Sequence, residues 1–271
     1  MSLSADKIKL FFKRVRAEVF PDRYNCIFCD KELFTPNRQG VCDTCRPLLP
    51  YITTAYCLKC GTPFLPEGAD APRSSFDDEV GYIEALRDED SLSSGYCAMC
   101  RHNTRHFDEV RSVFAYCGVV RSAICRLKYG GARYLAPYFG AYLSDLYLAD
   151  PVPVDLEVSV PLHRGRQRER GYNQAHLIAE NFAERMQLAY FPQALTKTKH
   201  TLSQTKLSFR DRQENLHGAF QADKALVKGK RVLVIDDVLT TGATMSEVAH
   251  TLKRAGAVHV YGLTIANVAE R

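Results

Sequence analysis

The sequence predicts an α/β protein in which a mostly parallel sheet is flanked by helices and follows a small metal-binding region. Apolar, strand-like segments alternate with helical patterns over residues 109–271, and this alternation favours a parallel sheet. Eight of the ten cysteines form four Cys-x-x-Cys pairs in the first part of the chain. The 271 residues are enough to bury a sizeable core.

The strands and helices of the second part follow from hydrophobic periodicity. Strands are predicted over residues 109–120, 155–162, 229–237 and 259–268. Helices are predicted over residues 121–129, 133–148, 173–187 and 244–255, the last ended by Gly256. Near the N-terminus, residues 4–19 predict a basic amphipathic helix. We interpret this helix as packed on its own domain, with a membrane surface or nucleic acid as the alternative contact.

Composition favours a cytoplasmic protein. The net charge of +5 is mild, so its distribution matters more than its total. No apolar run approaches a transmembrane helix in length, and the first twenty residues lack the uncharged apolar core of a signal peptide. In a long chain without an export signal, paired Cys-x-x-Cys motifs indicate metal in a reducing compartment rather than disulfides.

The paired cysteines predict two structural zinc sites. Each Cys-x-x-Cys turns two thiolates toward one point, and two pairs complete the tetrahedron of sulfur that structural zinc prefers. Four cysteines leave no open coordination position, so neither site is expected to be catalytic. Consecutive pairing gives Cys26, Cys29, Cys42 and Cys45 as one set, and Cys57, Cys60, Cys97 and Cys100 as the other. Interleaved pairing and redox Cys-x-x-Cys sites are the alternatives.

A change of composition near Asp108 divides the chain. We predict an N-terminal helix and metal-binding region over residues 1–108, with an acidic insertion at about 66–95, and an α/β domain over 109–271. Four further side chains could in principle bind a metal ion, but we expect other roles for them. His102 and His106 are expected to face solvent, and Cys117 and Cys125 to be core thiols.

Two adjacent carboxylates precede a turn that suits an anion. Asp236 and Asp237 follow the buried segment `VLVI`, and `TTGAT` then leads into a helix. Backbone N–H groups, threonine hydroxyls and the helix dipole can together hold a phosphate, and Gly242 permits the close approach. Neither a Walker A loop nor G-x-G-x-x-G occurs in the chain. These features favour a phosphorylated sugar, whose hydroxyls the carboxylates bind directly or through Mg²⁺.

A hydrophobic strand, two acids and a Thr-Gly-x-Thr turn resemble the signature of type I phosphoribosyltransferases, which bind 5-phosphoribosyl 1-pyrophosphate (PRPP). The segments `SVPLHRGRQRERGYNQA`, `TLSQTKLSFRDRQENLHGAF` and `AICRLKYGGARYLA`, with the paired cysteine motifs, resemble the ComF family over almost the whole chain. That resemblance implies a double zinc ribbon followed by a phosphoribosyltransferase-like domain. The acidic insertion departs from the family pattern and puts the shape of the second ribbon in doubt.

The resemblance also implies roles for particular residues. The catalytic candidates are Asp236, Asp237 and Arg164. PRPP, with Mg²⁺, is expected at Leu162, His163, Arg164, Asp236, Asp237, Thr240, Thr241, Gly242, Ala243 and Thr244. A mobile lid is expected to carry Lys206, Arg210 and Arg212. Single-stranded DNA is the candidate partner of Arg166, Arg168, Arg170, Lys128 and Arg133, whose alternative is an ordinary solvated face.

Three functional hypotheses remain open. The first is a phosphoribosyltransferase with an unknown acceptor, linked to DNA uptake in natural transformation or to DNA utilisation. Purine-salvage members of the superfamily place an acid where this chain has Thr240, which argues against a purine acceptor handled in that way. The second is a non-catalytic protein that binds single-stranded DNA and is regulated by PRPP. The third is a zinc-ribbon scaffold with a degenerate site. The DNA-uptake machinery at the inner membrane face is a candidate partner.

Overall fold

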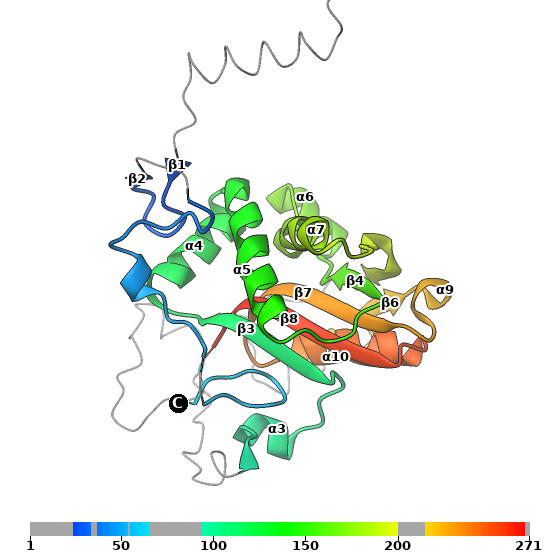
Figure 1. Ribbon diagram of the computed structural model, residues 1–271. Helices are drawn as coiled ribbons and strands as arrows, with labels where there is room; N and C mark the ends of the chain where they lie inside the picture. The colour runs from blue at the N-terminus through cyan, green and yellow to red at the C-terminus, as the bar shows by residue number, and fades with distance from the viewer. Residues whose placement is uncertain (1–23, 34–36, 54, 65–93, 200–214, 269–271) are drawn as a thin grey trace, which may run out of the picture.

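The core of the protein is a four-stranded parallel sheet with strand order β3-β8-β7-β4 (Figure 1). The computed structural model describes residues 24–33, 37–53, 55–64, 94–199 and 215–268. The predicted N-terminal helix, most of the acidic insertion and the lid residues Lys206, Arg210 and Arg212 lie outside these ranges. No helix in the described ranges is long and apolar enough to cross a bilayer.

The sheet consists of β3 (Glu109–Ala115), β4 (Leu156–Ser159), β7 (Arg231–Leu239) and β8 (His259–Asn267). Two antiparallel pairs lie outside it, β1 (Tyr24–Asn25) with β2 (Glu32–Leu33), and β5 (Leu195–Lys197) with β6 (Phe220–Ala222). The α-helices are α3 (Ala98–His102), α4 (Gly118–Tyr129), α5 (Ala136–Ala149), α6 (Arg164–Arg170), α7 (Gln174–Met186), α9 (Lys224–Val227) and α10 (Ala243–Arg254). Short 3-10 helices are η1 (Arg46–Leu48), η2 (Arg133–Leu135) and η3 (Pro192–Ala194).

The parallel sheet and its flanking helices are those predicted, with local differences. β4 ends at Ser159 rather than at residue 162. β3 ends at Ala115 rather than at residue 120, because α4 already begins at Gly118; a short apolar run does not distinguish a strand from a buried helix. β7 continues to Leu239, because its last residues still pair with β8. The basic run over 164–170, which lies between the predicted strand 155–162 and the predicted helix 173–187, forms α6. This helix buries no residue, so its sequence carries no apolar periodicity that could predict it.

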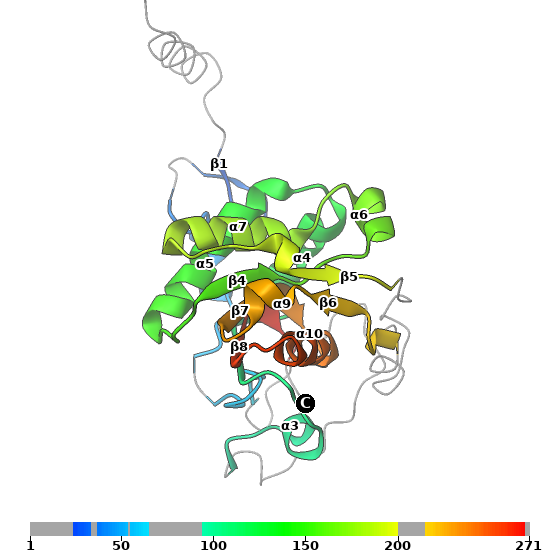
Figure 2. The same cartoon turned by 90° about the vertical axis from the view of Figure 1, so that its right-hand side faces the viewer.

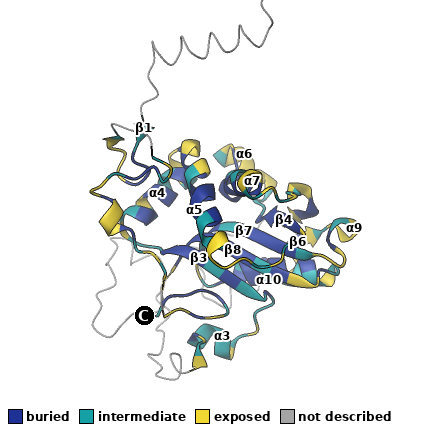
Figure 3. Cartoon of the chain, viewed as in Figure 1, coloured by how far each residue is buried: buried dark blue, intermediate teal, exposed yellow. Residues whose placement is uncertain are grey.

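Each face of the sheet carries its own hydrophobic core. Leu233 and Ile235 of β7 pack under α4, α5 and α7, whereas Val232 and Val234 pack against α10 on the other face. This alternation follows from the period of two along a strand. Figure 2 shows α5 and α7 on one side of the sheet and α10 on the other. In Figure 3 the central strands are buried along most of their length, while α6 is largely exposed.

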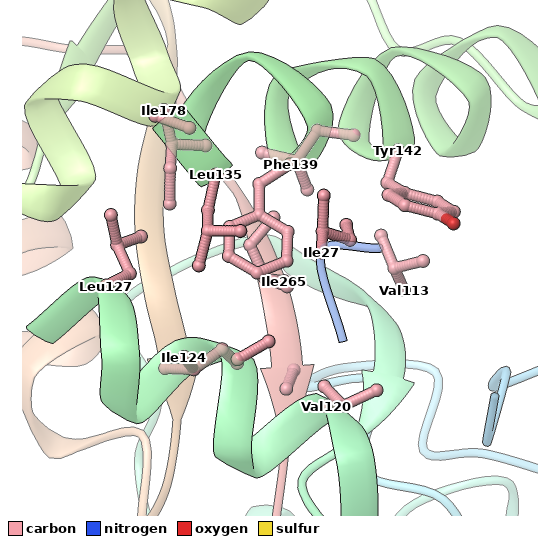
Figure 4. Close-up of a cluster of buried hydrophobic side chains, with 14 of the residues drawn as sticks. Ile27, Val113, Val120, Ile124, Leu127, Leu135, Phe139, Tyr142, Ile178 and Ile265 are labelled. Carbon is pink, nitrogen blue, oxygen red and sulfur yellow. The ribbon is translucent and has the colours of Figure 1, made fainter. Parts of the chain in front are cut away.

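The two cysteine clusters pack on opposite faces of the sheet. Cys26 and Ile27 belong to the core under α4 and α5, where Ile27 lies beside Phe139 (Figure 4). Cys57, Cys60 and Cys97 belong to the core that contains α10. Each metal-binding unit therefore shares a core with the α/β domain.

Backbone contacts fix the second cluster on the sheet. Gly61 has a φ of +68°, and a Cβ at this position would lie 2.7 Å from the carbonyl oxygen of Val110. Only glycine tolerates both the conformation and the approach. Asn267, the last residue of β8, donates a hydrogen bond from Nδ2 to the Cys60 carbonyl oxygen at 2.9 Å. The second cluster is therefore held against both β3 and β8.

Candidate functional site

The predicted anion turn links β7 to α10. Gly242 is the N-cap of α10 and has a φ of +72° and a ψ of 4°, which is the left-handed conformation. The backbone N–H of Ala243 donates to Thr241 Oγ1 at 3.4 Å, and Ser246 N–H donates to the Gly242 carbonyl at 2.9 Å. The first N–H groups of a helix have no partner within the helix, and the helix dipole favours negative charge there. The turn can therefore hold an anion at the carboxyl end of β7.

The acid pair, Asp236 and Asp237, lies within β7 just before this turn. Successive side chains of a strand point to opposite faces, so the two carboxylates do not project side by side. The backbone N–H of Asp237 donates to Asp236 Oδ1 at 2.9 Å. Burial, with the negative charge of Asp237 next, raises the pKa of Asp236 to about 7. A negative charge on Asp236 is therefore unfavourable beside that of Asp237.

Lys128 of α4 points toward the acid pair. Its Nζ lies 2.9 Å from Asp237 Oδ1, and only 21% of the lysine side chain and 11% of the aspartate side chain are exposed. Burial by itself would lower the pKa of Lys128, but the adjacent Asp237 outweighs this and raises it. Lys128, a candidate contact for single-stranded DNA by sequence, is paired in the structure with a carboxylate of the candidate sugar site.

A cavity of about 600 Å³ opens beside β4, the strand next to β7. Three residues expected to bind PRPP, Leu162, His163 and Arg164, line one side of it. The β5–β6 pair closes another side with Lys197. The remaining lining residues are Ser159, Pro161, Gln167, Asn173, His176, Pro192, Leu195, Thr196, Thr198 and Gln221. The cavity thus collects cationic and hydroxyl groups that suit a phosphate-bearing ligand.

Two cations interact at this cavity, Lys197 in its wall and Arg166 of α6. Burial, with the positive charge of Arg166 next, lowers the pKa of Lys197 to about 8, and Asp236 acts in the opposite sense. Two neighbouring cations destabilise each other, and a bound anion would relieve that repulsion. The electrostatic link between Lys197 and Asp236 also connects the cavity to the acid pair.

A hydrogen-bonded network that no sequence motif predicts lies at the cavity wall. The hydroxyl of Tyr190 is hydrogen-bonded with Ser159 Oγ at 2.9 Å and with His176 Nδ1 at 2.6 Å. The three residues come from β4, α7 and the segment after α7, so no local pattern predicts their contact. The network fixes one side of the cavity because each hydroxyl and ring has a defined partner.

Aromatic rings and arginines meet on the outer surface beside α6. The guanidinium of Arg170 lies 5.0 Å from the ring centre of Tyr129, and that of Arg133 lies 4.4 Å from the ring centre of Tyr172. Tyr129 is 74% exposed. We refer to Tyr129, Arg133 and Arg170 as the basic–aromatic surface. Arg168 of α6 and Tyr134 of η2 are also exposed. Arg166, which was expected with this group, interacts electrostatically with Lys197 of the cavity.

The segment after the second cluster reaches the anion turn. A Cβ on Gly242 would lie 3.4 Å from Arg105 Nη1 and 3.9 Å from Phe107 Cε1. The backbone N–H of His106 donates to Ser246 Oγ in the first turn of α10 at 3.2 Å. The second cluster and the anion turn are therefore in contact through residues 105–107, which sequence analysis did not connect with the turn.

The eight paired cysteines form two compact groups, which are the two sets given by consecutive pairing. Within each group, the four Sγ atoms all lie within 4.8 Å of one another. Four thiolates in such a group are the donor set of structural zinc. No other group of three or more histidine, cysteine or acidic side chains with this spacing occurs among the described residues.

Two known domain families match separate parts of the chain. Residues 16–75 match the family described as double zinc ribbon domain, and residues 178–269 match the phosphoribosyl transferase domain. Among solved structures, glutamine PRPP amidotransferase from B. subtilis gives a TM-score of 0.35 at 21% identity, over 49% of this chain and 26% of that one.

Several known proteins are similar to this chain, some over most of its length and others over part of it. Competence protein F of Haemophilus influenzae is 26% identical over 254 residues, which are 89% of this chain and 96% of that protein. Competence protein ComFC of Bacillus subtilis is 28% identical over 85% of this chain and 89% of its own length. DNA utilization protein YhgH of Escherichia coli strain K12 is 39% identical over 39% of this chain, which is 46% of that protein. This chain therefore belongs to the ComF family, in which a double zinc ribbon is joined to a phosphoribosyltransferase domain.

Proposed function

We propose that this chain binds PRPP with Mg²⁺ and transfers its phosphoribosyl group to an acceptor, in a process of DNA uptake or DNA utilisation. The observation that carries this proposal is a cationic cavity next to an acid pair and an anion turn, all at the carboxyl ends of the neighbouring strands β4 and β7. In open parallel sheets, ligands bind at this end of the strands. The names of the competence and DNA-utilisation relatives support the biological setting.

Each part of PRPP has a complementary group in this site. The 5-phosphate fits the backbone N–H groups of residues 241–244 and the α10 dipole. The ribose hydroxyls fit the carboxylates of Asp236 and Asp237. The pyrophosphate fits the cavity wall formed by residues 162–164 and Lys197.

The reaction would break the bond between the anomeric carbon and a pyrophosphate oxygen, which leaves with the electron pair. The acceptor would form the new bond to that carbon and lose a proton. Asp236 and Asp237 would stabilise positive charge that develops on the ribose, and Arg164 would orient the leaving group. Mg²⁺ bound with PRPP would neutralise charge on the leaving pyrophosphate. Zinc in the two cysteine clusters would be structural.

PRPP with Mg²⁺ is expected to raise the melting temperature of the wild-type chain, because a ligand that binds only the folded state stabilises it by about 2.7 kcal/mol at a hundred times its Kd. Asp236→Asn combined with Asp237→Asn is expected to abolish this shift. Asp155→Asn is the matched control, because Asp155 pairs with Arg231 at 2.7 Å where β4 and β7 begin. A wild-type chain that shows no shift with PRPP would contradict the proposal. Release of pyrophosphate with a panel of acceptors then tests transfer.

Binding of single-stranded DNA is the second candidate function, and the basic–aromatic surface favours it. Exposed Tyr129 offers a ring for base stacking, and Arg170 beside it offers positive charge to the backbone. In this case PRPP would act as a regulatory ligand.

Tyr129→Ala with Arg170→Ala is expected to weaken binding of a labelled oligonucleotide by about tenfold or more, since stacking contributes about 1–3 kcal/mol per base. The affinity of the wild-type chain is expected to fall steeply with salt. Arg185→Ala with Arg254→Ala is the control, because both arginines are exposed and lie outside this surface. Equal affinity of the two double variants would argue against DNA binding at this surface.

A further inference from the structure

We propose that Lys128 is a built-in cation of the sugar site. Its positive charge positions Asp237 to bind ribose hydroxyls and excludes a divalent metal ion from the acid pair. This inference rests on the proposed function and deepens it. The acid pair would bind the sugar directly, and Mg²⁺ would enter the site only with the pyrophosphate. The observation that carries it is the ion pair of 2.9 Å between Lys128 Nζ and Asp237 Oδ1.

The end of α4 holds Lys128 in a defined position. Its neighbour Leu127 is fully buried in the core under α4, α5 and α7. The hydroxyl of Tyr172, in the segment between α6 and α7, donates to the carbonyl oxygen of Leu127. A lysine on a packed helix end, with most of its side chain removed from water, loses less freedom on pairing than an exposed one. Its ammonium group therefore acts as a fixed charge.

The arrangement of the acid pair suits a sugar better than a metal ion. Asp236 and Asp237 are consecutive residues of β7, so their side chains leave the strand in opposite directions. Asp236 Oδ1 accepts the Asp237 N–H, and Asp237 Oδ1 meets Lys128. A divalent ion at Asp237 would have to displace an ammonium group that already provides the positive charge. A hydroxyl needs only a free lone pair, and the other carboxylate oxygens still offer these.

The same charge prepares Asp237 for its ligand. An ion pair keeps a carboxylate anionic and restricts its rotamers, and an anionic oxygen accepts stronger hydrogen bonds than a neutral carboxyl group. Removing one partner of a buried ion pair leaves an uncompensated charge. Loss of Lys128 is therefore expected to disorder Asp237 and to open it to another cation.

The test compares Lys128→Met with Lys253→Met. Lys253 also forms an ion pair of 2.9 Å, with Asp108, but at the far end of α10. Ribose 5-phosphate is the probe for the sugar site because it lacks pyrophosphate, and Mn²⁺ detected by paramagnetic resonance is the probe for a metal site. In the wild-type chain, ribose 5-phosphate affinity is expected to be independent of Mg²⁺, and Mn²⁺ alone is expected not to bind at the acid pair.

Lys128→Met is expected to weaken ribose 5-phosphate binding about tenfold or more and to gain about one Mn²⁺ per chain. Adding Asp237→Asn should remove the gained ion, and Lys128→Arg should restore the sugar affinity. Loss of the gained ion on adding Asp237→Asn distinguishes a site at the acid pair from metal bound by a misfolded chain. For a wild-type chain that binds ribose 5-phosphate, the proposal is overturned if Lys128→Met matches Lys253→Met in either measurement.

The two proposals fail in different ways. If the wild-type chain binds neither PRPP nor ribose 5-phosphate, the proposed function fails, and the Mn²⁺ measurement alone decides the role of Lys128. If PRPP binds and Lys128→Met changes nothing, the proposed function stands and the built-in cation is excluded.

Discussion

The variant Cys100→Ser is expected to lose the metal of the second cluster and to melt far below the wild-type chain. Structural zinc contributes on the order of 10 kcal/mol in small zinc-binding peptides, which is comparable with the whole stability of a typical domain, roughly 5–15 kcal/mol. Cys57 and Cys97 of this cluster are at most 1% exposed and share a core with α10. Loss of the metal would therefore weaken the same core that supports the anion turn.

Cys100 is the most informative position because it is the least buried of the four ligands, so its change to serine disturbs packing least. Metal content is expected to fall from about two zinc ions per chain to about one. Cys125→Ser is the control, since this thiol lies outside both clusters and should leave the metal content unchanged. PRPP-dependent stabilisation is also expected to disappear in Cys100→Ser, because residues 105–107 connect the cluster to the turn. Wild-type melting with only one zinc would contradict this account.

The second large effect is expected at Gly242. Replacement by alanine places a side chain in the left-handed conformation, at about 1–2 kcal/mol, and 3.4 Å from Arg105 Nη1. The backbone of the turn is expected to shift to relieve this strain, and the N–H groups that would hold the phosphate then lose their alignment. PRPP affinity is expected to fall about tenfold or more, because hydrogen bonds to charged groups contribute about 1.5–3 kcal/mol each.

Gly229→Ala separates backbone strain from the effect on the site. Gly229 has a φ of +73°, almost the same as Gly242, but no atom lies within 4 Å of its Cβ position. Both variants should therefore lose similar stability, while only Gly242→Ala should lose PRPP affinity, measured by calorimetry. Equal PRPP affinity of the two variants would mean that the turn does not hold the ligand.

Local sequence patterns were informative where a feature lies within one short segment. The strand, acid pair and turn over residues 231–244 follow one another, so periodicity and turn chemistry predicted β7, the turn and α10 to within two residues. The opposite case is α6. Its residues Arg164–Arg170 include no buried side chain, and a helix without an apolar face gives periodicity nothing to detect.

Charge along the chain did not predict which basic residues face inward. Lys128 and Arg133 lie close together in `LKYGGAR` and were expected on one surface. The structure turns Lys128 toward Asp237 and places Arg133 against the ring of Tyr172. Sequence spacing gives the direction of a side chain relative to its own helix, but its partner depends on which strand that helix covers.

The sequence by itself predicted the four Cys-x-x-Cys pairs and the strand, turn and helix of the candidate phosphate site, because each depends on the spacing of neighbouring residues. Which pairs share a group was decided by the structure, which brings together the consecutive ones. Tertiary structure alone decided that the two clusters lie on opposite faces of the sheet, that Lys128 meets Asp237 and that Arg105 lies beside Gly242. These contacts join segments far apart in the chain. They form only when helix and strand faces pack together to bury apolar surface, and no local pattern encodes which faces meet.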